Sequence, residues 1–272
     1  MATLDPSKDL LTLAEEQLEA DYGREFSVVA KRKQLDKFGF ASGVTSTSFV
    51  VVSQVSGAAA DPTSNSITHV TGGSGDDHVV RVEGHYLTAA GTLVFHVQTV
   101  TLSGTTNVPL SQPLARASRA VVFDGGIPTG PINVRIGSGG TSVLTIVAGD
   151  VQTQHCKTST SYRDAWIITN FGGAVLGSNN ADVTFELQQR PLFDPSGVAY
   201  TDPNWRPMTR RWVLGNEGRA EFPQETPLLV GPNTDVRVVV KTSTGTVSVT
   251  AHVDGYLAVD LAHSNETPAA AA

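Results

Sequence analysis

Several short stretches of the sequence hold residue types that can do chemistry, and the most specific of them is a calcium-loop pattern. Gly72 to Val80, "GGSGDDHVV", matches the nonapeptide G-G-x-G-x-D-x-U-x of parallel β-helices that bind Ca²⁺. Such sites are shared between stacked turns, so consecutive nonapeptides are needed to complete the oxygen shell. Because the pattern occurs once and the flanking residues do not continue it, we interpret the stretch as a glycine-rich turn. A lone, weak cation site is the alternative.

Histidine and cysteine pairs offer a second kind of chemistry. His85 and His96 are predicted to be neighbours across a hairpin, and Glu83 shares the face of His85, as a metal site would need. Alternating polar positions on a half-solvated sheet give such clusters freely, so we favour a surface without metal. His155 and Cys156 are adjacent, and neighbours in a strand point to opposite faces. They therefore make a poor base–nucleophile pair, and a buried packing thiol is the better interpretation.

The remaining acidic residues and the known motifs do not indicate an enzyme. Carboxylates such as Asp182, Glu186 and Glu221 are scattered, and the sequence does not pair them across a cleft. It contains no G-x-S-x-G elbow, no phosphate-binding glycine loop and no H-E-x-x-H. We expect no catalytic residue, no metal and no cofactor.

One cluster combines aromatic rings with cations. The segment "YTDPNWRPMTRRW" places Trp205 and Trp212 close to Arg210, with Arg210 and Trp212 on one face of a strand. Such groups stack on sugars or bases, or anchor a protein interface. A loop pinned by its own aromatic residues is an equally open interpretation. Among the binding interpretations, concentrated Trp and Arg favour an interface between subunits.

Composition limits the classes of partner. The 272 residues carry a net charge of −7, which leaves no global basic field for nucleic acid or anionic lipid. Cys156 is the only cysteine, so the chain forms no internal disulfide and no cysteine-based zinc cluster. No apolar run approaches the ~20 residues of a membrane helix, and the N-terminus lacks the pattern of a signal peptide. We expect a soluble protein made in a reducing cytoplasm, with no nucleic-acid or membrane partner.

Residues 1–40 are predicted to form an N-terminal helical arm. The sequence from Leu4 to Gly23 indicates one helix. Its apolar stripe is formed by Leu10, Leu11, Ala14 and Leu18. A basic run, Lys31, Arg32 and Lys33, follows it, in a segment that is either a second helix or an extended arm, since its periodicity favours neither. The stripe needs a surface to cover it, which is either the β-domain of its own chain or a neighbouring subunit. We predict the neighbouring subunit, which makes Leu10, Leu11, Leu18 and the basic run interface candidates.

From about Ser46 the hydrophobic pattern changes to a period of two. Near the end of the chain, Val249 and Val253 are predicted to face one way, and Thr250 and His252 the other. Short strand-like runs without helices between them favour antiparallel sandwiches over a parallel sheet. The fold class is therefore all-β, with two tandem antiparallel β-sandwich domains of Ig-like or jelly-roll-like type after the short helix. We place a first β-sandwich at 41–150, a second, jelly-roll-like one at 151–262 and a flexible tail at 263–272.

The sequence of the predicted strands resembles that of a known family. One motif is a strand pair of the form "V-x-G-x-…-T-V-T-L-x-G", here Val82, Gly84 and Thr99 to Gly104. The other is a closing "K-T-S-x-G-T-x-x-V-x-A-x-x-x-G-Y-L", here Lys241 to Leu257. Over roughly residues 37–259 the chain resembles virion proteins of tailed bacteriophages that have two tandem β-domains.

The resemblance implies a structural role in the virion, as a decoration, collar, neck or fibre protein made in the host cytoplasm. It carries no catalytic residue to transfer. It implies assembly as a homo-oligomer with other virion proteins of the capsid, portal, neck or tail. The alternative is a receptor-binding or carbohydrate-binding tail protein that uses the cluster of Trp205 and Arg210 on a host-surface glycan.

Overall fold

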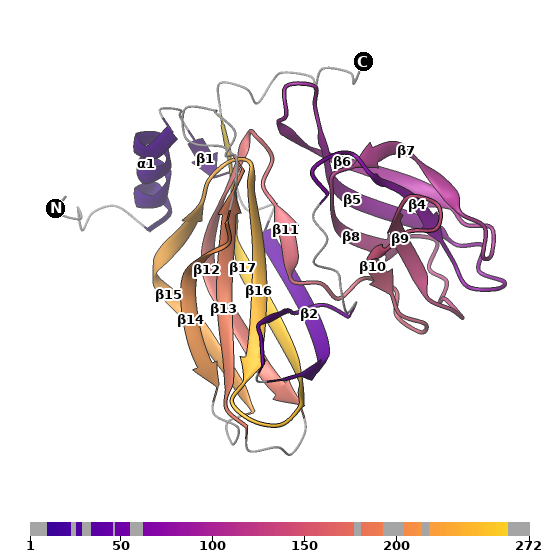
Figure 1. Cartoon of the computed structure of the whole chain (residues 1–272). Helices are drawn as coiled ribbons and strands as arrows, with labels where there is room; N and C mark the ends of the chain where they lie inside the picture. Colours follow the sequence, from indigo (N-terminus) through magenta and orange to yellow (C-terminus); the bar gives the residue numbers. More distant parts are fainter. Residues whose placement is uncertain are drawn as a thin grey trace.

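The computed structural model describes residues 10–22, 26–28, 34–45, 47–54, 62–176, 181–192, 204–213 and 218–260. One helix, α1 (Leu10–Tyr22), precedes a chain that is otherwise built from antiparallel strands. These strands form two β-sandwiches that lie side by side (Figure 1). The all-β fold class predicted from the sequence is confirmed.

The first sandwich packs a four-stranded sheet, in the order β10-β9-β4-β7, on a three-stranded sheet, β6-β5-β8. We call them the β9 sheet and the β5 sheet. Their strands are β4 (Ile67–Thr71), β5 (Val79–Leu87), β6 (Leu93–Thr101), β7 (Val108–Leu114), β8 (Arg116–Val122), β9 (Ile132–Ile136) and β10 (Ser142–Ile146). The core between them contains Val80 and Val82 of β5, Val134 of β9 and Ile146 of β10, all buried. Period-two burial along β8 shows the alternation that places one face of each strand in the core.

The second sandwich has two five-stranded sheets. The β12 sheet runs β1-β17-β12-β15, with β2 also paired to β17, and the β13 sheet runs β11-β16-β13-β14, with β3 also paired to β16. Their strands are β1 (Phe26–Val28), β2 (Gln34–Val44), β3 (Val50–Val51), β11 (Lys157–Ser159), β12 (Asp164–Leu176), β13 (Val183–Pro191), β14 (Arg206–Val213), β15 (Arg219–Val230), β16 (Thr234–Thr242) and β17 (Val247–Asp260). In β17 the predicted alternation holds: Val249 and Val253 face the core, while Thr250 and His252 face outward.

The expected boundary between residues 40 and 41 is contradicted by the strand pairing. β2 pairs with β17 from Gln34 to Val44, and β3 pairs with β16, so this N-terminal segment belongs to the second sandwich. Residues 34–40 are therefore extended strand of the second sandwich, which agrees with the extended alternative for this segment and not with the helical one. Near the other expected boundary, Val122 and Thr153 take part in backbone hydrogen bonds that keep residues 151–153 beside β8 of the first sandwich.

The helix α1 lies on the outer face of the β12 sheet, where its own chain covers its apolar stripe. Ala14 and Leu18 are buried against Ala165 and Ile167 of β12 and Ala258 of β17. Leu11 packs at the edge of this cluster. The prediction that a neighbouring subunit covers the stripe is therefore wrong for Leu18, because the β-domain of the same chain buries it completely. Leu11 is only partly buried, so its place at an interface stays a prediction. The side chain of Leu10 lies outside the described residues.

A buried ion cluster joins the two sandwiches. Asp235 of β16 is fully buried; its Oδ1 accepts hydrogen bonds from Nε of Arg116 on β8, at 2.9 Å, and from Oγ of Ser159, at 2.6 Å. Its Oδ2 accepts from Nε of Arg190 on β13, at 3.1 Å. Two guanidinium groups from two different domains thus share one carboxylate, which ties the sandwiches together.

Candidate binding hollow on the second sandwich

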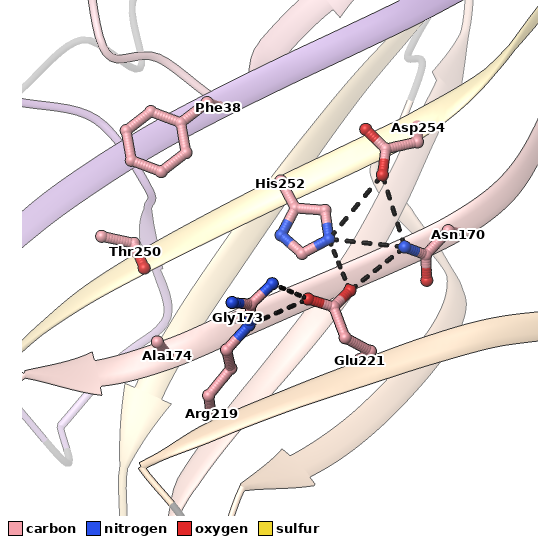
Figure 2. A pocket seen from close by; sticks show the side chains of 9 residues that line it. All are labelled: Phe38, Asn170, Gly173, Ala174, Arg219, Glu221, Thr250, His252 and Asp254. Carbon is pink, nitrogen blue, oxygen red and sulfur yellow. Dashed lines mark hydrogen bonds and ion pairs between the residues drawn. The ribbon is translucent and has the colours of Figure 1, made fainter.

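The outer face of the β12 sheet has an apolar half and a polar half. The helix α1 covers the apolar half. The polar half is left uncovered and forms a hollow of about 570 Å³, which we call the β17 hollow (Figure 2). It is lined by Phe38, Asn170, Gly173, Ala174, Arg219, Glu221, Thr250, His252 and Asp254. The face of a single sheet therefore serves packing at one end and leaves functional groups accessible at the other.

Four strands position these groups. Phe38 stands on β2 at one side, and Arg219 with Glu221 stands on β15 at the other (Figure 2). Between them, β12 and β17 supply a floor of small residues, including Ala174 and Thr250. Phe38 is 45% exposed although it is a large hydrophobic residue. The hollow thus has one aromatic wall and one charged wall.

Charged and polar side chains on the right of Figure 2 form one hydrogen-bonded network. Arg219 donates from Nε (3.0 Å) and Nη2 (2.6 Å) to Oε1 of Glu221. Oε2 of Glu221 lies 2.8 Å from Nε2 of His252 and accepts from Nδ2 of Asn170 at 3.1 Å. The same Nδ2 group donates to Oδ2 of Asp254 at 3.3 Å. Asn170 therefore bridges the two carboxylates.

The network fixes the ionisation of Glu221 and the tautomer of His252. Partial burial raises the pKa of the Glu221 carboxyl, but hydrogen bonds from Arg219 and Asn170 and the adjacent His252 outweigh it and hold the pKa below its ordinary value. An ionised carboxylate only accepts hydrogen bonds, so Nε2 of His252 carries the shared proton. Nδ1 of a neutral His252 is then an acceptor.

A glycine leaves the space in which the side chains of His252 and Glu221 come into contact. A Cβ at Gly172 of β12 would lie 2.4 Å from Cε1 of His252 and 2.9 Å from Oε2 of Glu221. Such distances are too short for ordinary contacts, so any other residue at 172 would push the two side chains apart. The neighbouring Gly173 has the same role on the inner face, where a Cβ would meet the ring of Phe185 at 2.5 Å.

This arrangement of an aromatic wall and a charged wall can bind a polar ligand. Within the described ranges, no group of three or more His, Cys, Asp and Glu side chains is arranged to hold a metal ion. His252 and Glu221 form a base–carboxylate pair, and Thr250 is the hydroxyl-bearing side chain that shares the hollow. Among the side chains drawn in Figure 2, the hydroxyl of Thr250 makes no hydrogen bond with His252.

The cluster around Trp205 is arranged differently from a free binding platform. The guanidinium groups of Arg190 and Arg237 lie over the Trp205 ring, with their Cζ atoms 4.5 and 3.9 Å from its centroid. Arg210 donates from Nε to Oε2 of buried Glu186 at 2.6 Å. The interpretation of a segment pinned by its own groups thus fits Trp205, and Trp212 is left as the exposed aromatic residue, at 61%.

The calcium-loop stretch is a turn closed by its own aspartate. Asp76 is buried; its Oδ2 accepts from the amides of Gly73 (2.9 Å) and Gly130 (3.2 Å), and its Oδ1 from the amide and hydroxyl of Thr129, both at 2.9 Å. Burial raises the pKa of Asp76, but these bonds outweigh it and lower the pKa. Both carboxylate oxygens already serve the loop, which supports the turn and leaves Asp77 as the exposed acid.

The predicted histidine pairs are separated. β5 and β6 do form a hairpin, but His85 pairs with Phe95, and its buried ring stacks edge-on against that ring. His96 instead contacts Tyr86. His155 is buried and bonds through Nδ1 to Oγ of Ser53 at 2.9 Å, while Cys156 is buried as expected for a packing thiol.

The remaining interface candidates, Lys31, Arg32 and Lys33, lie outside the described residues. The β17 hollow was missed by the sequence interpretation, which left Glu221 unpaired. Two signals pointed to it: the outward positions of Thr250 and His252 on β17, and the Gly172–Gly173 pair within an otherwise bulky strand.

Comparisons with known proteins give little beyond this geometry. No family model matches the sequence, and no curated protein does. Solved structures that are similar include that of the Gt strain of infectious bursal disease virus, at 9% identity over 88% of this chain and 76% of that chain, with a TM-score of 0.19. The VP2 subviral particle of the same virus is 7% identical over 87% of this chain and 70% of that chain, with a TM-score of 0.18. TM-scores this low carry no argument about this chain. In the part of the chain that the structure describes, no helix is long and apolar enough to span a membrane.

Proposed function

We propose that the chain is a structural subunit of a tailed-bacteriophage virion, of the decoration, collar, neck or fibre type. It acts by binding other copies of itself and other virion proteins of the capsid, portal, neck or tail, and not by catalysis. The resemblance of its strand sequences to those of tailed-phage virion proteins supports this class of function. The observation that carries the proposal is a pair of exposed surfaces with opposite charge at different places on the molecule.

The first surface, which we call the apolar tip, lies in the loops of the first sandwich. It consists of Phe123, Ile127, Val147 and Val151, of which Phe123 is 63% and Ile127 64% exposed. Two backbone hydrogen bonds, Val122 N to Val151 O (2.8 Å) and Gly149 N to Pro128 O (3.0 Å), hold the loops together. Asp124 and Asp150 lie in the same loops and make the tip acidic. A gathered set of large exposed apolar side chains marks an interaction surface.

The second surface is the exposed edge strand β14 of the β13 sheet, which we call the β14 edge. Its exposed residues include Trp212, Arg206, Arg210 and Arg211. Trp and Arg are the residues most enriched at interface hot spots. Cationic side chains on an edge strand also discourage unspecific strand pairing, so the edge is protected against aggregation and still able to bind an acidic partner.

Charge complementarity makes a second copy of this chain the best occupant for both surfaces. The apolar tip is acidic and the β14 edge is basic, so the tip of one copy suits the edge of the next. A contact between two different patches is heterologous, and repeated copies then close into a ring or grow as a fibre. Both outcomes are geometries that collars, necks and fibres use.

A mixing experiment tests this head-to-tail contact. Ile127→Asp disables the apolar tip and Trp212→Ala disables the β14 edge, so each variant alone should be monomeric where the wild type assembles. An equimolar mixture retains one intact tip and one intact edge, and it should give heterodimers and no larger species. Light scattering after gel filtration measures the masses. Leu176→Ala, at an exposed apolar residue outside both surfaces, is the matched control.

Two results would contradict the proposal. Variants that assemble like the wild type would show that neither surface is the contact. A wild-type chain that neither self-associates nor is incorporated into particles when expressed with the other structural genes would refute the virion role itself.

A further inference from the structure

The β17 hollow combines features that proteins use to bind sugars, and it is independent of the two assembly surfaces. The ring of Phe38 is half-exposed and faces the hollow from β2, across the small residues of the floor (Figure 2). Arg219, Glu221 and Asp254 present charged groups from the other side. An apolar wall with a few convergent polar groups is the usual composition of a small-molecule site.

The charges and hydrogen bonds of the hollow argue against anions and metal ions as ligands. Glu221 and Asp254 would repel an anion, and the single guanidinium near them, that of Arg219, is already bonded twice to Glu221. A metal cation would need several carboxylate oxygens with free lone pairs, but Oε1 and Oε2 of Glu221 each accept two close contacts, and Asp254 alone does not complete a metal shell. A neutral ligand avoids both difficulties.

Hydrogen-bonding capacity that the network does not use is mixed in kind. Oδ1 of Asp254 accepts no hydrogen bond from the described residues, whereas Oδ2 is bonded to Asn170. Nη1 of Arg219 and the hydroxyl of Thr250 are donors without a partner among those residues. A ligand that offers several neighbouring groups, each able to donate and accept, matches this set. Vicinal hydroxyl groups have this property.

We propose that the β17 hollow binds a neutral saccharide. One apolar face of a sugar ring packs on Phe38, and its vicinal hydroxyls bond to Asp254, Arg219 and Thr250. The inference does not rest on the proposed assembly. It places carbohydrate recognition at this hollow and not at Trp205, whose ring is covered by the guanidinium groups of Arg190 and Arg237.

The test uses the full-length chain on an array that holds neutral hexose oligosaccharides together with sialylated and sulfated glycans. The best neutral binder is then titrated by calorimetry into the wild type and three variants. Phe38→Ala removes the aromatic wall, Asp254→Asn removes the free acceptor charge, and Thr250→Trp fills the floor without deleting a charge. Each should weaken binding by about tenfold or more, since hydrogen bonds to charged groups and ring contacts are of that size. Circular dichroism melting identifies variants that fail to fold.

Trp212→Ala and Trp205→Ala are the matched controls, because they remove aromatic rings from the β13 sheet side of the same sandwich. Both should bind the saccharide within about twofold of the wild type. Binding to no neutral saccharide of the array overturns the proposal. So does affinity that survives both Phe38→Ala and Thr250→Trp in folded protein, and so does loss of affinity in Trp205→Ala alone. None of these results bears on the mixing experiment, so the two proposals fail separately.

Discussion

At the residue scale, Gly172 decides whether His252 and Glu221 can touch. A methyl group there would lie 2.4 Å from Cε1 of His252 and 2.9 Å from both Oε2 of Glu221 and the carbonyl oxygen of Ala220. We predict that Gly172→Ala lowers the free energy of unfolding by about 1–3 kcal/mol, the usual cost of inserting a methylene into a packed site. Urea unfolding measures the loss, and the NMR shifts of the His252 ring report the broken contact.

Gly139 supplies the control for this substitution. A Cβ at Gly139 meets nothing within 4 Å, and its backbone does not have the positive φ that favours glycine. Gly139→Ala should leave stability unchanged or raise it by about 0.5 kcal/mol, because alanine restricts the unfolded chain. Equal effects of the two substitutions would show that the close approach at Gly172 is relieved elsewhere in the sheet.

Buried His85 makes the protein sensitive to acid. Burial lowers the pKa of His85 to about 3, and the positive charges of Lys37 and Arg116 act in the same direction, while the carboxylate of Asp235 raises the pKa only in part. An unfolded histidine titrates near 6.5. Between those pH values the histidine is therefore protonated in the unfolded chain and neutral in the folded chain. The stability is fully present above pH 6.5 and is lost as the pH falls toward 3.

We predict a loss of about 1.4 kcal/mol per pH unit from this one group between pH 6 and pH 4. His155 adds a loss of the same direction, because its burial also lowers its pKa. His85→Leu should reduce the slope of unfolding free energy against pH by the contribution of one proton, about 1.4 kcal/mol per pH unit, independently of its effect on stability at pH 7. Urea unfolding at several pH values measures it. An unchanged slope in His85→Leu would show that the folded protein protonates the wild-type ring without cost.

At the element scale, the sequence predicts strands whose signals are local and misses pairings that are distant. The outward and inward residues of β17 were predicted correctly because Val249 to Val253 alternate within the strand. The β2 strand was not predicted, because glycine interrupts its pattern. A Cβ at Gly39 would lie 2.6 Å from the carbonyl oxygen of Val52, so close packing requires the glycine that hides the strand.

The candidate site was out of reach for a related reason. His252 and Glu221 are 31 positions apart, and Asn170 is 82 positions from His252, so only the β15-β12-β17 pairing brings them together. A sequence without known contacts does not specify which strands are neighbours in an antiparallel sheet. The residue types were visible, but the register that joins them was not.

Leu18 tests which surface the helix α1 covers. Its side chain is fully buried against the outer face of the β12 sheet, beside Ala165 and Ala258. We predict that Leu18→Ala lowers the unfolding free energy of the isolated chain by about 2–5 kcal/mol, as for other buried leucines. Leu176→Ala, at an exposed leucine of the same sheet, should cost under about 0.5 kcal/mol. If Leu18→Ala spares the isolated chain and reduces only its assembly, the helix packs on a neighbouring subunit after all.

At the scale of the whole molecule, the chain crosses between its two sandwiches more than once. The strands β2 and β3 complete the second sandwich before the first begins, and β11 returns the chain to it. The first sandwich is therefore inserted in the sequence of the second. A hydrogen bond from the amide of Leu93 to Oδ1 of Asn233 (2.9 Å) adds to the ion cluster between them. The prediction of two tandem domains does not include this insertion, because β2 pairs with β17, which lies more than 200 residues later in the chain.

Asp235 should therefore control whether the two sandwiches unfold together. Burial raises the pKa of Asp235, but the positive charges of Arg116 and Arg190 outweigh burial and lower the pKa to about 2. The ionised carboxylate therefore contributes its full stability above the unfolded pKa near 3.8, and this stability is lost as the pH falls through 2. Asp235→Asn removes the buried carboxylate that both guanidinium groups share, which costs about 3–5 kcal/mol at pH 7. Because Arg116 belongs to the first sandwich and Asp235 with Arg190 to the second, we expect one unfolding transition in calorimetry for the wild type and two for Asp235→Asn. Glu83→Gln, which breaks the partly exposed pair with Arg81 inside β5, should cost under about 1 kcal/mol and keep one transition. One transition in Asp235→Asn would mean that the sandwiches are coupled mainly by contacts other than this carboxylate.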